Sequence, residues 1–389
     1  MSRKLLDNNF CTIPWTGFEL EPNGNVKNCI ISKEKLGNIN HADIQDILAD
    51  TTAISIKEQM LKGEYPSNCE GCYFQEKNRA KSFDNISSRT YYAKEIGPHI
   101  STGLFDNANN FELRHVDIRW SNRCNQACVY CGPSYSSKWA KELNKKVESD
   151  RNSRTKLKEY IFANVKNLKN IYLAGGEPLL MNENREFLEL LLKENSEVHI
   201  RVNTNLSHTN TGVFELLQKF KNVHWTVSVE SIEKQYEYIR HGGNWDNFLK
   251  NLTTIKNNNK HKITFNMLYF ILNYRSIFDC VSYFQNLGFG NNSFVIGPLY
   301  TPEYLNILNL PAGVIEQLKS KFQTEIDGKP GFLLQNSYEN ILKYLNEPFD
   351  KDLNRTYNTL TAMDQRRNID SKTIFVELYE EILNKGINK

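Results

Sequence analysis

Short apolar runs alternate with longer amphipathic segments over the central part of the chain. From residue 112, strand-like runs occur at 116–121, 170–174, 198–203, 223–229, 262–270 and 292–296. Segments with apolar residues at helical spacing fill most of the intervals. Such alternation predicts a parallel sheet. Because six units are fewer than the eight that close a complete barrel, we predict an α/β fold built on a partial (β/α)6 TIM barrel.

The N-terminal part has a different pattern. Extended runs at 18–21 and 26–30 flank Asn23-Gly24, and an Asn-Gly between extended runs is a strong hairpin signal. Apolar residues between 43 and 62 have the spacing of short amphipathic helices. Residues 73–110 are polar without a clear period and are interpreted as a connector. We therefore predict a small N-terminal cysteine-rich α+β module that precedes the barrel.

Helical spacing returns after residue 300, with apolar positions at 314–322, 341–345 and 374–383. These segments predict a helical C-terminal extension that covers the open barrel. Between the last two of them, the run 364–367 (Asp-Gln-Arg-Arg) is expected to form surface salt bridges, with an anchor to the barrel or to substrate as the alternative. The predicted domains are 1–110, 111–300 and 301–389.

Charge and hydropathy narrow the possible partners. The chain has 48 basic and 45 acidic residues and a net charge of +3, which is too balanced to indicate nucleic acid as a partner. Its longest apolar run, 267–272, is too short to span a bilayer, and its start lacks the apolar core of a signal peptide. We expect a cytoplasmic protein with no membrane partner.

Eight cysteines without a signal peptide indicate metal ligation more than disulfides. Cys124, Cys128 and Cys131 form a C-x3-C-x2-C motif directly after the first barrel strand. Three thiolates on a 4Fe-4S cluster leave one iron free to bind another ligand, whereas four thiolates complete a zinc or cluster site. Cys280 lies in an amphipathic segment, so a buried structural thiol is favoured over a thiol that donates hydrogen.

The N-terminal module contains four cysteines, which is enough to complete a second metal site. Cys11 and Cys29 flank the predicted hairpin, and Cys69 and Cys72 form a C-x2-C pair. Zinc and an iron-sulfur cluster fit this spacing equally well, and unrelated buried thiols are the competing interpretation. A bound metal would supply stability that a small, weakly hydrophobic module lacks.

Polar and small residues follow the predicted strands at one rim of the barrel, where ligands bind in such folds. After the second strand, 175–178 (Gly-Gly-Glu-Pro) could bring backbone close to a ligand or form an ordinary turn. Polar groups at the ends of the third and fourth strands could bind sugar hydroxyls or cap helices. These are Asn203, Ser228 and Glu230. Tyr130 could stack on a purine or pack in the core.

Together, the three-cysteine motif with an aromatic before its last cysteine and the Gly-Gly-Glu-Pro run resemble the radical S-adenosylmethionine (SAM) superfamily. The resemblance spans about residues 112–300. It implies that the cysteine triad holds a 4Fe-4S cluster whose open iron binds SAM. It also implies SAM contacts by Tyr130 (adenine), by Gly176 and Glu177 (methionine amino group), and by Asn203, Ser228 and Glu230 (ribose and carboxylate). Further SAM contacts are implied for Gly175, Pro178, Arg240 and Ile296.

The N-terminal cysteines resemble the SPASM/twitch auxiliary-cluster domains that accompany many radical SAM enzymes. The resemblance rests on Cys11-Thr12-Ile13-Pro14-Trp15, the hairpin, Cys29 and the pair Cys69 and Cys72. It implies a second 4Fe-4S cluster with four protein ligands. In the family this module normally follows the barrel, whereas here it comes first.

These resemblances imply that an electron from reduced flavodoxin or ferredoxin cleaves SAM to a 5'-deoxyadenosyl radical that abstracts hydrogen from a substrate. A peptide or protein substrate is the leading hypothesis, by analogy with enzymes that carry this module. The alternative is a small metabolite such as a sugar, nucleotide or amino acid. A non-catalytic iron-sulfur or zinc protein is the third interpretation.

Overall fold

The computed structural model describes residues 9–78, 88–147, 151–258 and 260–383. The chain forms two compact units. The first comprises Met1–Cys124, Pro133–Trp225 and Ile255–Lys262, and the second comprises Asn125–Gly132, Thr226–Thr254 and Ile263–Lys389. Strand β7 (Val223–Ser228) carries the chain from the first unit into the second.

The first unit contains a sheet with the strand order β3-β2-β1-β4-β5-β6. The N-terminal hairpin is confirmed, because β1 (Gly17–Leu20) pairs antiparallel with β2 (Asn25–Lys27), which also pairs antiparallel with β3 (Gly37–Asn38). Strand β1 then pairs in parallel with β4 (His115–Ile118). Parallel pairing continues to β5 (Asn170–Leu173) and β6 (His199–Thr204). The N-terminal module therefore extends the barrel sheet.

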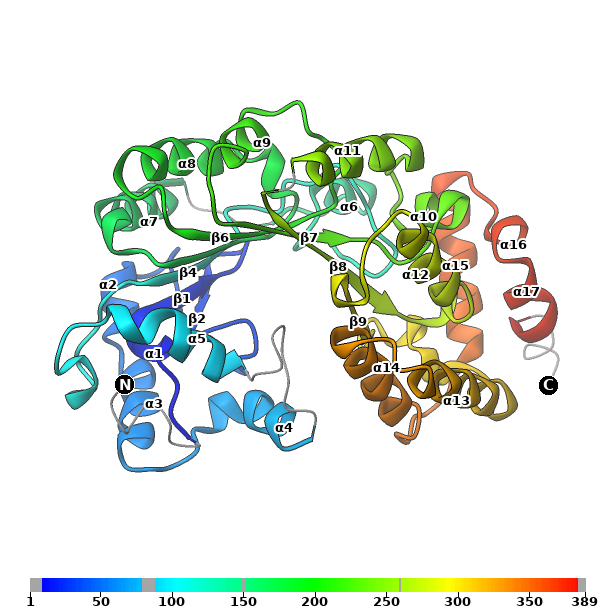
Figure 1. Ribbon diagram of the computed structural model, residues 1–389, viewed down its shortest axis with the longest axis horizontal. Helices are drawn as coiled ribbons and strands as arrows, with labels where there is room; N and C mark the ends of the chain where they lie inside the picture. Colours follow the sequence, from blue (N-terminus) through cyan, green and yellow to red (C-terminus); the bar gives the residue numbers. More distant parts are fainter. Residues whose placement is uncertain (1–8, 79–87, 148–150, 259, 384–389) are drawn as a thin grey trace. The chain divides into compact units, whose positions relative to one another are not determined.

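Alternation along these strands separates an apolar face from a polar face. Val116, Ile171 and Ile200 are in register on neighbouring strands and are at most 1% exposed. Figure 1 shows α7 (Arg151–Ala163), α8 (Asn182–Glu194) and α9 (Gly212–Leu217) along one side of this sheet. Burial of such side chains, at about 25 cal/mol per Å² of apolar surface, fixes which residues face the helices.

Other helices of the first unit belong to the N-terminal module and the cysteine loop. They are α1 (Ile13–Thr16), α2 (Ile44–Leu48), α3 (Thr51–Leu61), α4 (Glu70–Asn78), α5 (Ser88–Ile96) and α6 (Ser137–Glu142). Most of α4 and all of α5 lie within residues 73–110, where the sequence shows no helical period. The ring centroid of Tyr92 on α5 lies 4.7 Å from that of His115 on β4. Such long-range packing stabilises α5, whose own sequence shows no helical period.

The second unit continues the α/β pattern. Strand β8 (Lys262–Tyr269) pairs in parallel with β9 (Phe294–Pro298). All six strand-like runs predicted after residue 112 are confirmed as strands β4 to β9. The helices before β9 are α10 (Glu233–Ile239), α11 (Trp245–Asn257) and α12 (Ser276–Asn286).

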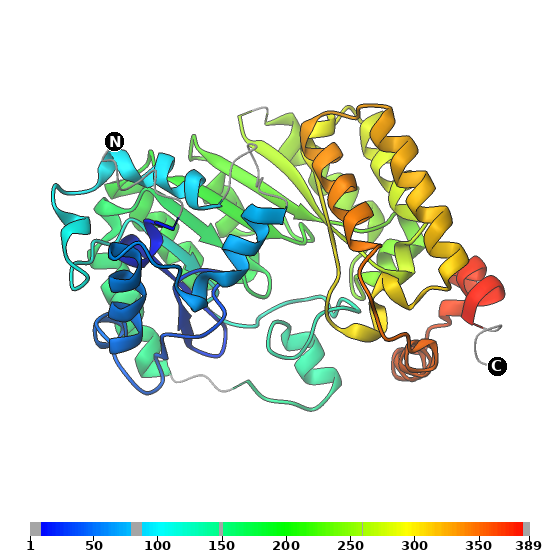
Figure 2. The same cartoon turned by 90° about the horizontal axis from the view of Figure 1, so that it is seen from below.

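A helical C-terminal part follows β9 and confirms the predicted extension (Figures 1 and 2). It contains α13 (Ala312–Asp327), α14 (Phe332–Tyr344), α15 (Leu353–Arg367), α16 (Ser371–Ile374) and α17 (Val376–Leu378). Helix α14 packs on β9 and on α13, and Ile296 N–H donates to Ser337 Oγ at 3.0 Å. Within the described ranges, every helix is too short or too polar to cross a bilayer.

Candidate metal centres

Four cysteines come together in the first unit. Cys11 lies before α1 and Cys29 follows β2. Cys69 directly precedes α4, and Cys72 lies in the first turn of that helix. Every pair among the four thiols interacts electrostatically. Burial and these neighbours raise the pKa of Cys69 to about 12. Burial followed by the carboxylate of Glu76 raises the pKa of Cys72 to about 12.

Burial disfavours the ionised form of these thiols, so four thiolates would form here only with a positively charged partner such as a metal. Among the described residues, no three His, Cys, Asp or Glu side chains lie close enough to hold one metal ion. A single zinc binds sulfur at about 2.3 Å and draws its ligands tightly together. A four-iron cluster is larger and takes four thiolate ligands, the number of thiols that converge here.

The first cysteine of the C-x3-C-x2-C loop belongs to the first unit. Cys124 N–H donates to Ser137 Oγ at 3.0 Å, and that hydroxyl lies 3.1 Å from Cys124 O. Asn205 Nδ2 donates to Cys124 Sγ at 3.9 Å. The sequence predicted no role for Ser137 or Asn205. The one available signal was that Asn205 directly follows β6, at the same rim as Cys124.

Glu177 connects the ends of β5 and β6 beneath this cysteine. Its Oε1 accepts from Thr204 Oγ1 at 2.7 Å and from Leu179 N at 3.1 Å, and its Oε2 accepts from Asn205 N at 2.7 Å. The residue is fully buried. The carboxylate predicted to meet a ligand amine thus holds the main chain of Asn205 in place.

The two glycines before Glu177 allow the cysteine loop to pack closely. Gly175 has φ +111°, a conformation that favours glycine. A Cβ at Gly176 would lie 2.6 Å from the carbonyl carbon of Arg123 and 2.8 Å from that of Asn122. Pro178 begins a short 3-10 helix, and its carbonyl accepts from Asn184 Nδ2 at 2.9 Å. Gly176 therefore brings the segment just before Cys124 against the end of β5.

The other two loop cysteines belong to the second unit, where Cys128 lies beside a buried network. Arg240 donates to both carboxylate oxygens of Glu230, at 2.8 and 2.7 Å. It also donates to Tyr130 Oη at 2.7 Å and to Cys128 Sγ at 3.8 Å. Tyr130 Oη donates to Glu230 Oε1 at 3.0 Å. The structure thus brings together three predicted SAM contacts and one cluster cysteine.

Burial and charge act against each other in this network. Glu230 is 1% exposed and Arg240 is 4% exposed. Burial opposes the charge of Arg240, but Glu230, Tyr130 and Cys128 outweigh it and raise the pKa of Arg240 well above its usual value. Burial raises the pKa of Cys128, and Arg240 opposes this rise. Arg240 is therefore a permanent cation next to the Cys128 sulfur.

The backbone of the cysteine loop is fixed by hydrogen bonds within the second unit. Ala127 N donates to His241 O and Val129 N donates to Ile239 O, both at 2.8 Å. Arg367 Nη2, from α15, donates to Ala127 O at 2.9 Å. On the same helix, Asp364 accepts from Tyr238 Oη at 2.7 Å. Asp364 and Arg367 therefore anchor α15 to the barrel, which was one of the alternatives expected for 364–367.

The remaining candidates lie at different places. Asn203 is the fifth residue of β6 and Ser228 is the last residue of β7, and both are half-buried. Ile296 is 3% exposed in β9, where its N–H is bonded to α14. Cys280 is fully buried on α12, and burial raises the pKa of its thiol well above the usual value. This burial agrees with the structural role expected for Cys280.

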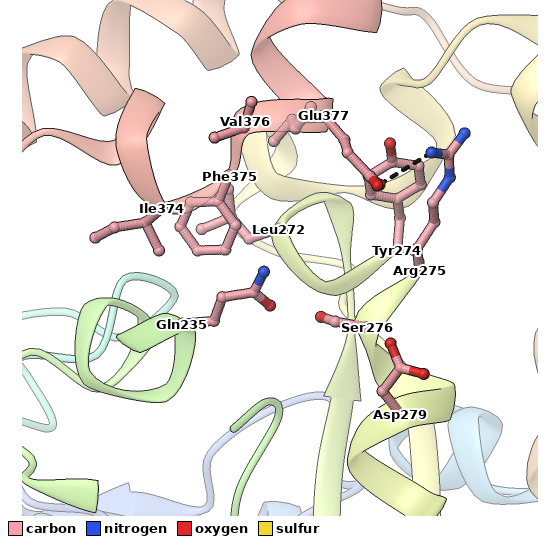
Figure 3. Close-up of a pocket in the computed structure, with 11 residues that line it drawn as sticks. Gln235, Leu272, Tyr274, Arg275, Ser276, Asp279, Ile374, Phe375, Val376 and Glu377 are labelled. Carbon is pink, nitrogen blue, oxygen red and sulfur yellow. Dashed lines mark hydrogen bonds and ion pairs between the residues drawn. The ribbon is translucent and has the colours of Figure 1, made fainter. Parts of the chain in front are cut away.

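A separate cavity of about 280 Å³ lies in the second unit between α12 and the C-terminal segment (Figure 3). The Arg275–Glu377 ion pair, at 3.0 Å, lies at this cavity, with Asp279 and Ser276 on α12. Gln235 also lines it and accepts from Ser231 Oγ at 2.8 Å. None of the predicted site residues lines this cavity. It is therefore distinct from the cysteine sites.

Comparison with known proteins connects both cysteine sites to families. The model of the radical SAM superfamily matches residues 118–284, and the model of the SPASM iron-sulfur cluster-binding domain matches residues 11–73. These ranges contain the three-cysteine loop and the four-cysteine site. A search of curated proteins found no match.

Solved structures that resemble the chain include native anSMEcpe with bound AdoMet, at 18% identity and a TM-score of 0.40, covering 54% of this chain and 60% of that one. Another is anSMEcpe with AdoMet and the Cp18Cys peptide, at 15% identity and a TM-score of 0.38, covering 54% and 59%. A third is Streptococcus suis SuiB bound to its precursor peptide SuiA, at 16% identity and a TM-score of 0.40, covering 75% and 64%.

The chain thus spans less than two thirds of the length of these three structures. The two family models together cover most of the residues that form the cysteine sites and the strands around them. The chain therefore contains a radical SAM domain, with a SPASM iron-sulfur cluster-binding domain before it.

Proposed function

We propose that this chain is a radical SAM enzyme that uses two 4Fe-4S clusters and acts on a peptide or protein substrate. The observation that carries the proposal is the convergence of four thiols in the SPASM domain together with a separate three-cysteine loop. In this proposal Cys124, Cys128 and Cys131 hold the SAM-binding cluster. Four further ligands hold the auxiliary cluster: Cys11, Cys29, Cys69 and Cys72.

When bound, the first cluster supplies the electron that cleaves SAM and so provides the radical that abstracts hydrogen. The chain's own residues hold that cluster's surroundings in place. Asn205 donates a hydrogen bond to one ligand sulfur, and Arg240 places a cation beside another. Because these groups are nearly excluded from water, their interactions with charge are strong.

Roles in SAM binding follow from the same network. We propose that the ring of Tyr130 faces adenine while its hydroxyl stays bonded to Glu230 and Arg240. Because Glu177 already uses both oxygens, we propose that Glu177 orients Asn205 and that the main chain at Gly176 meets the methionine amino group. Asn203 and Ser228 remain proposed ribose contacts, and Ile296 remains a proposed adenine contact.

A peptide or protein substrate is proposed because the chain carries a SPASM domain of the kind found in peptide-modifying enzymes. The electron donor is proposed to be reduced flavodoxin or ferredoxin. Both donors belong to the reducing cytoplasm, where the thiols stay available for iron. A small metabolite is the alternative substrate. It is retained because the auxiliary domain here precedes the barrel, unlike the usual order in the family.

Anaerobic reconstitution tests the cluster count. The proposal expects roughly eight irons per chain, and roughly four would overturn the two-cluster assignment. With SAM and dithionite the protein should produce 5'-deoxyadenosine. The Cys124→Ala/Cys128→Ala/Cys131→Ala variant should lose this product and about half of the iron. Cys280→Ala, which removes a buried thiol outside both sites, is the matched control and should retain both.

The substrate class needs a second experiment. The reduced protein is incubated with SAM and with the product of any short open reading frame next to its gene, and the mass of that peptide is followed. A mass change that requires SAM and the three cysteines supports a peptide substrate. An unchanged peptide, combined with SAM cleavage that a small-molecule extract stimulates, assigns the metabolite alternative. If neither SAM cleavage nor a mass change occurs, the protein is not catalytic.

A further inference from the structure

One arginine is held against the four-cysteine site by specific contacts. Arg89, on α5, has a side chain that is 11% exposed. Its Nε donates to Glu76 Oε1 at 2.9 Å, and its Nη2 pairs with the other carboxylate oxygen of Glu76. Its Nη1 donates to Phe10 O at 2.8 Å. The guanidinium also lies over the ring of Tyr73, 5.0 Å from its centroid.

These partners adjoin cysteines of the site. Phe10 directly precedes Cys11, and Tyr73 directly follows Cys72. Glu76 lies one helical turn after Cys72, and its Oε1 is 4.0 Å from the Cys72 sulfur. The two cysteine-bearing segments are therefore tied together by a single guanidinium fork, a geometry that arginine provides and lysine does not.

Arg89 also places a positive charge near the thiols. Its charge acts on Cys11, Cys69 and Cys72. Glu76 carries a negative charge on the same side, where it acts on Cys72. The ion pair with Arg89 neutralises that carboxylate, which would otherwise face the sulfur alone.

Cluster potential depends on nearby charge and on hydrogen bonds to the sulfurs. Reduction adds one negative charge to a four-thiolate cluster, so a neighbouring cation stabilises the reduced form and a neighbouring carboxylate destabilises it. The effect is strong where both groups are shielded from water. Arg89 and Glu76 thus act on the potential in opposite directions.

We propose that Arg89 is a positioning residue that raises the reduction potential of the auxiliary cluster and that Glu76, through its ion pair with Arg89, sets how large this rise is. The inference rests on the proposed function, because it requires the auxiliary cluster. Arg89 acts through charge and through its hold on the two cysteine segments.

The test is an anaerobic redox titration of the reconstituted full chain, followed by electron paramagnetic resonance. Arg89→Met should shift the midpoint potential of one cluster to a more negative value and leave the other unchanged. Glu76→Gln should shift the same cluster in the positive direction. Arg89→Lys, which keeps the charge without the fork, should give a smaller negative shift than Arg89→Met. The matched control is Arg114→Met, which removes a half-buried arginine paired with Glu112 at 3.0 Å.

Iron content separates the possible failures. A wild-type protein with roughly four irons contradicts the two-cluster function itself. With roughly eight irons, unchanged potentials in both Arg89→Met and Glu76→Gln overturn the inference alone. If Arg89→Met loses the auxiliary iron, Glu76→Gln and Arg89→Lys decide. A positive shift of the midpoint potential in Glu76→Gln and a negative shift in Arg89→Lys support the proposal, and any other pair of results overturns it.

Discussion

Removing one partner of the buried Arg240–Glu230 ion pair should destabilise the protein by a measurable amount. In Arg240→Met, an apolar side chain of similar length replaces the guanidinium. Glu230, which is 1% exposed, then loses both of its hydrogen bonds from Arg240. Breaking a buried ion pair by removing one partner costs about 3–5 kcal/mol, because the remaining charge is uncompensated. We expect the free energy of unfolding to fall by about that amount.

Anaerobic urea titration of the reconstituted protein, followed by far-ultraviolet circular dichroism and tryptophan fluorescence, measures this loss. Arg275→Met is the matched control in the same unit, because the Arg275–Glu377 pair is exposed, with side chains 40% and 65% accessible. An exposed pair contributes about 0–1 kcal/mol, so this control should change stability little.

A double-mutant cycle tests the cause of the loss. Adding Glu230→Gln to Arg240→Met removes the uncompensated charge and should restore part of the lost stability. A loss below about 1 kcal/mol in Arg240→Met, or no recovery in the double variant, would refute the reasoning that Glu230 is a buried charge dependent on Arg240.

Three further predictions concern the first unit. Gly176→Ala should destabilise the protein by about 1–3 kcal/mol, because its Cβ would meet main-chain atoms of the cysteine loop. Gly313→Ala, with open space around its Cβ, is the control and should be tolerated. Equal urea midpoints for the two variants would contradict this prediction. Burial lowers the pKa of His115 to about 4, below the unfolded value of 6.5. The unfolded chain therefore binds the proton first, and about 3 kcal/mol of stability should be lost as the pH falls from about 6.5 to about 4, a slope that His115→Asn should flatten. Asn205→Ala removes the donor to the Cys124 sulfur and should shift the potential of the SAM-binding cluster negatively in a redox titration, and an unchanged potential would argue against that bond.

Local sequence pattern was sufficient to predict most strands. The alternation of apolar residues along β4, β5 and β6 indicates which face is buried, so the predicted runs and the observed strands agree closely. The pattern was insufficient for α5, because its partners are distant in sequence. Asn170 Nδ2 donates to Tyr91 Oη at 3.2 Å, and Tyr92 packs on His115. A helix stabilised mainly by such contacts has little periodic signal of its own.

The candidate site could be predicted in part for a similar reason. Cysteine spacing indicates which residues can share a metal, so both sets of cysteine ligands could be predicted from the sequence. The partners of Glu177 and Glu230 could not be read from spacing, since Thr204 and Asn205 reach Glu177 only when β5 and β6 align. Both carboxylates were expected to meet a ligand, and the structure adds that each accepts hydrogen bonds from protein donors.

Sheet register also sets which ionisable groups lie near Cys29 of the four-cysteine site. Glu19 and Asp117 are register partners on β1 and β4, and both act on Cys29. Arg119 pairs with both carboxylates, with 3.0 Å to Asp117 Oδ1. A shift of one residue in the pairing would move these side chains to the apolar face, which the packing of the alternate residues prevents. The same hydrophobic alternation that predicts the fold therefore places two buried carboxyl groups, which share one guanidinium, beside Cys29.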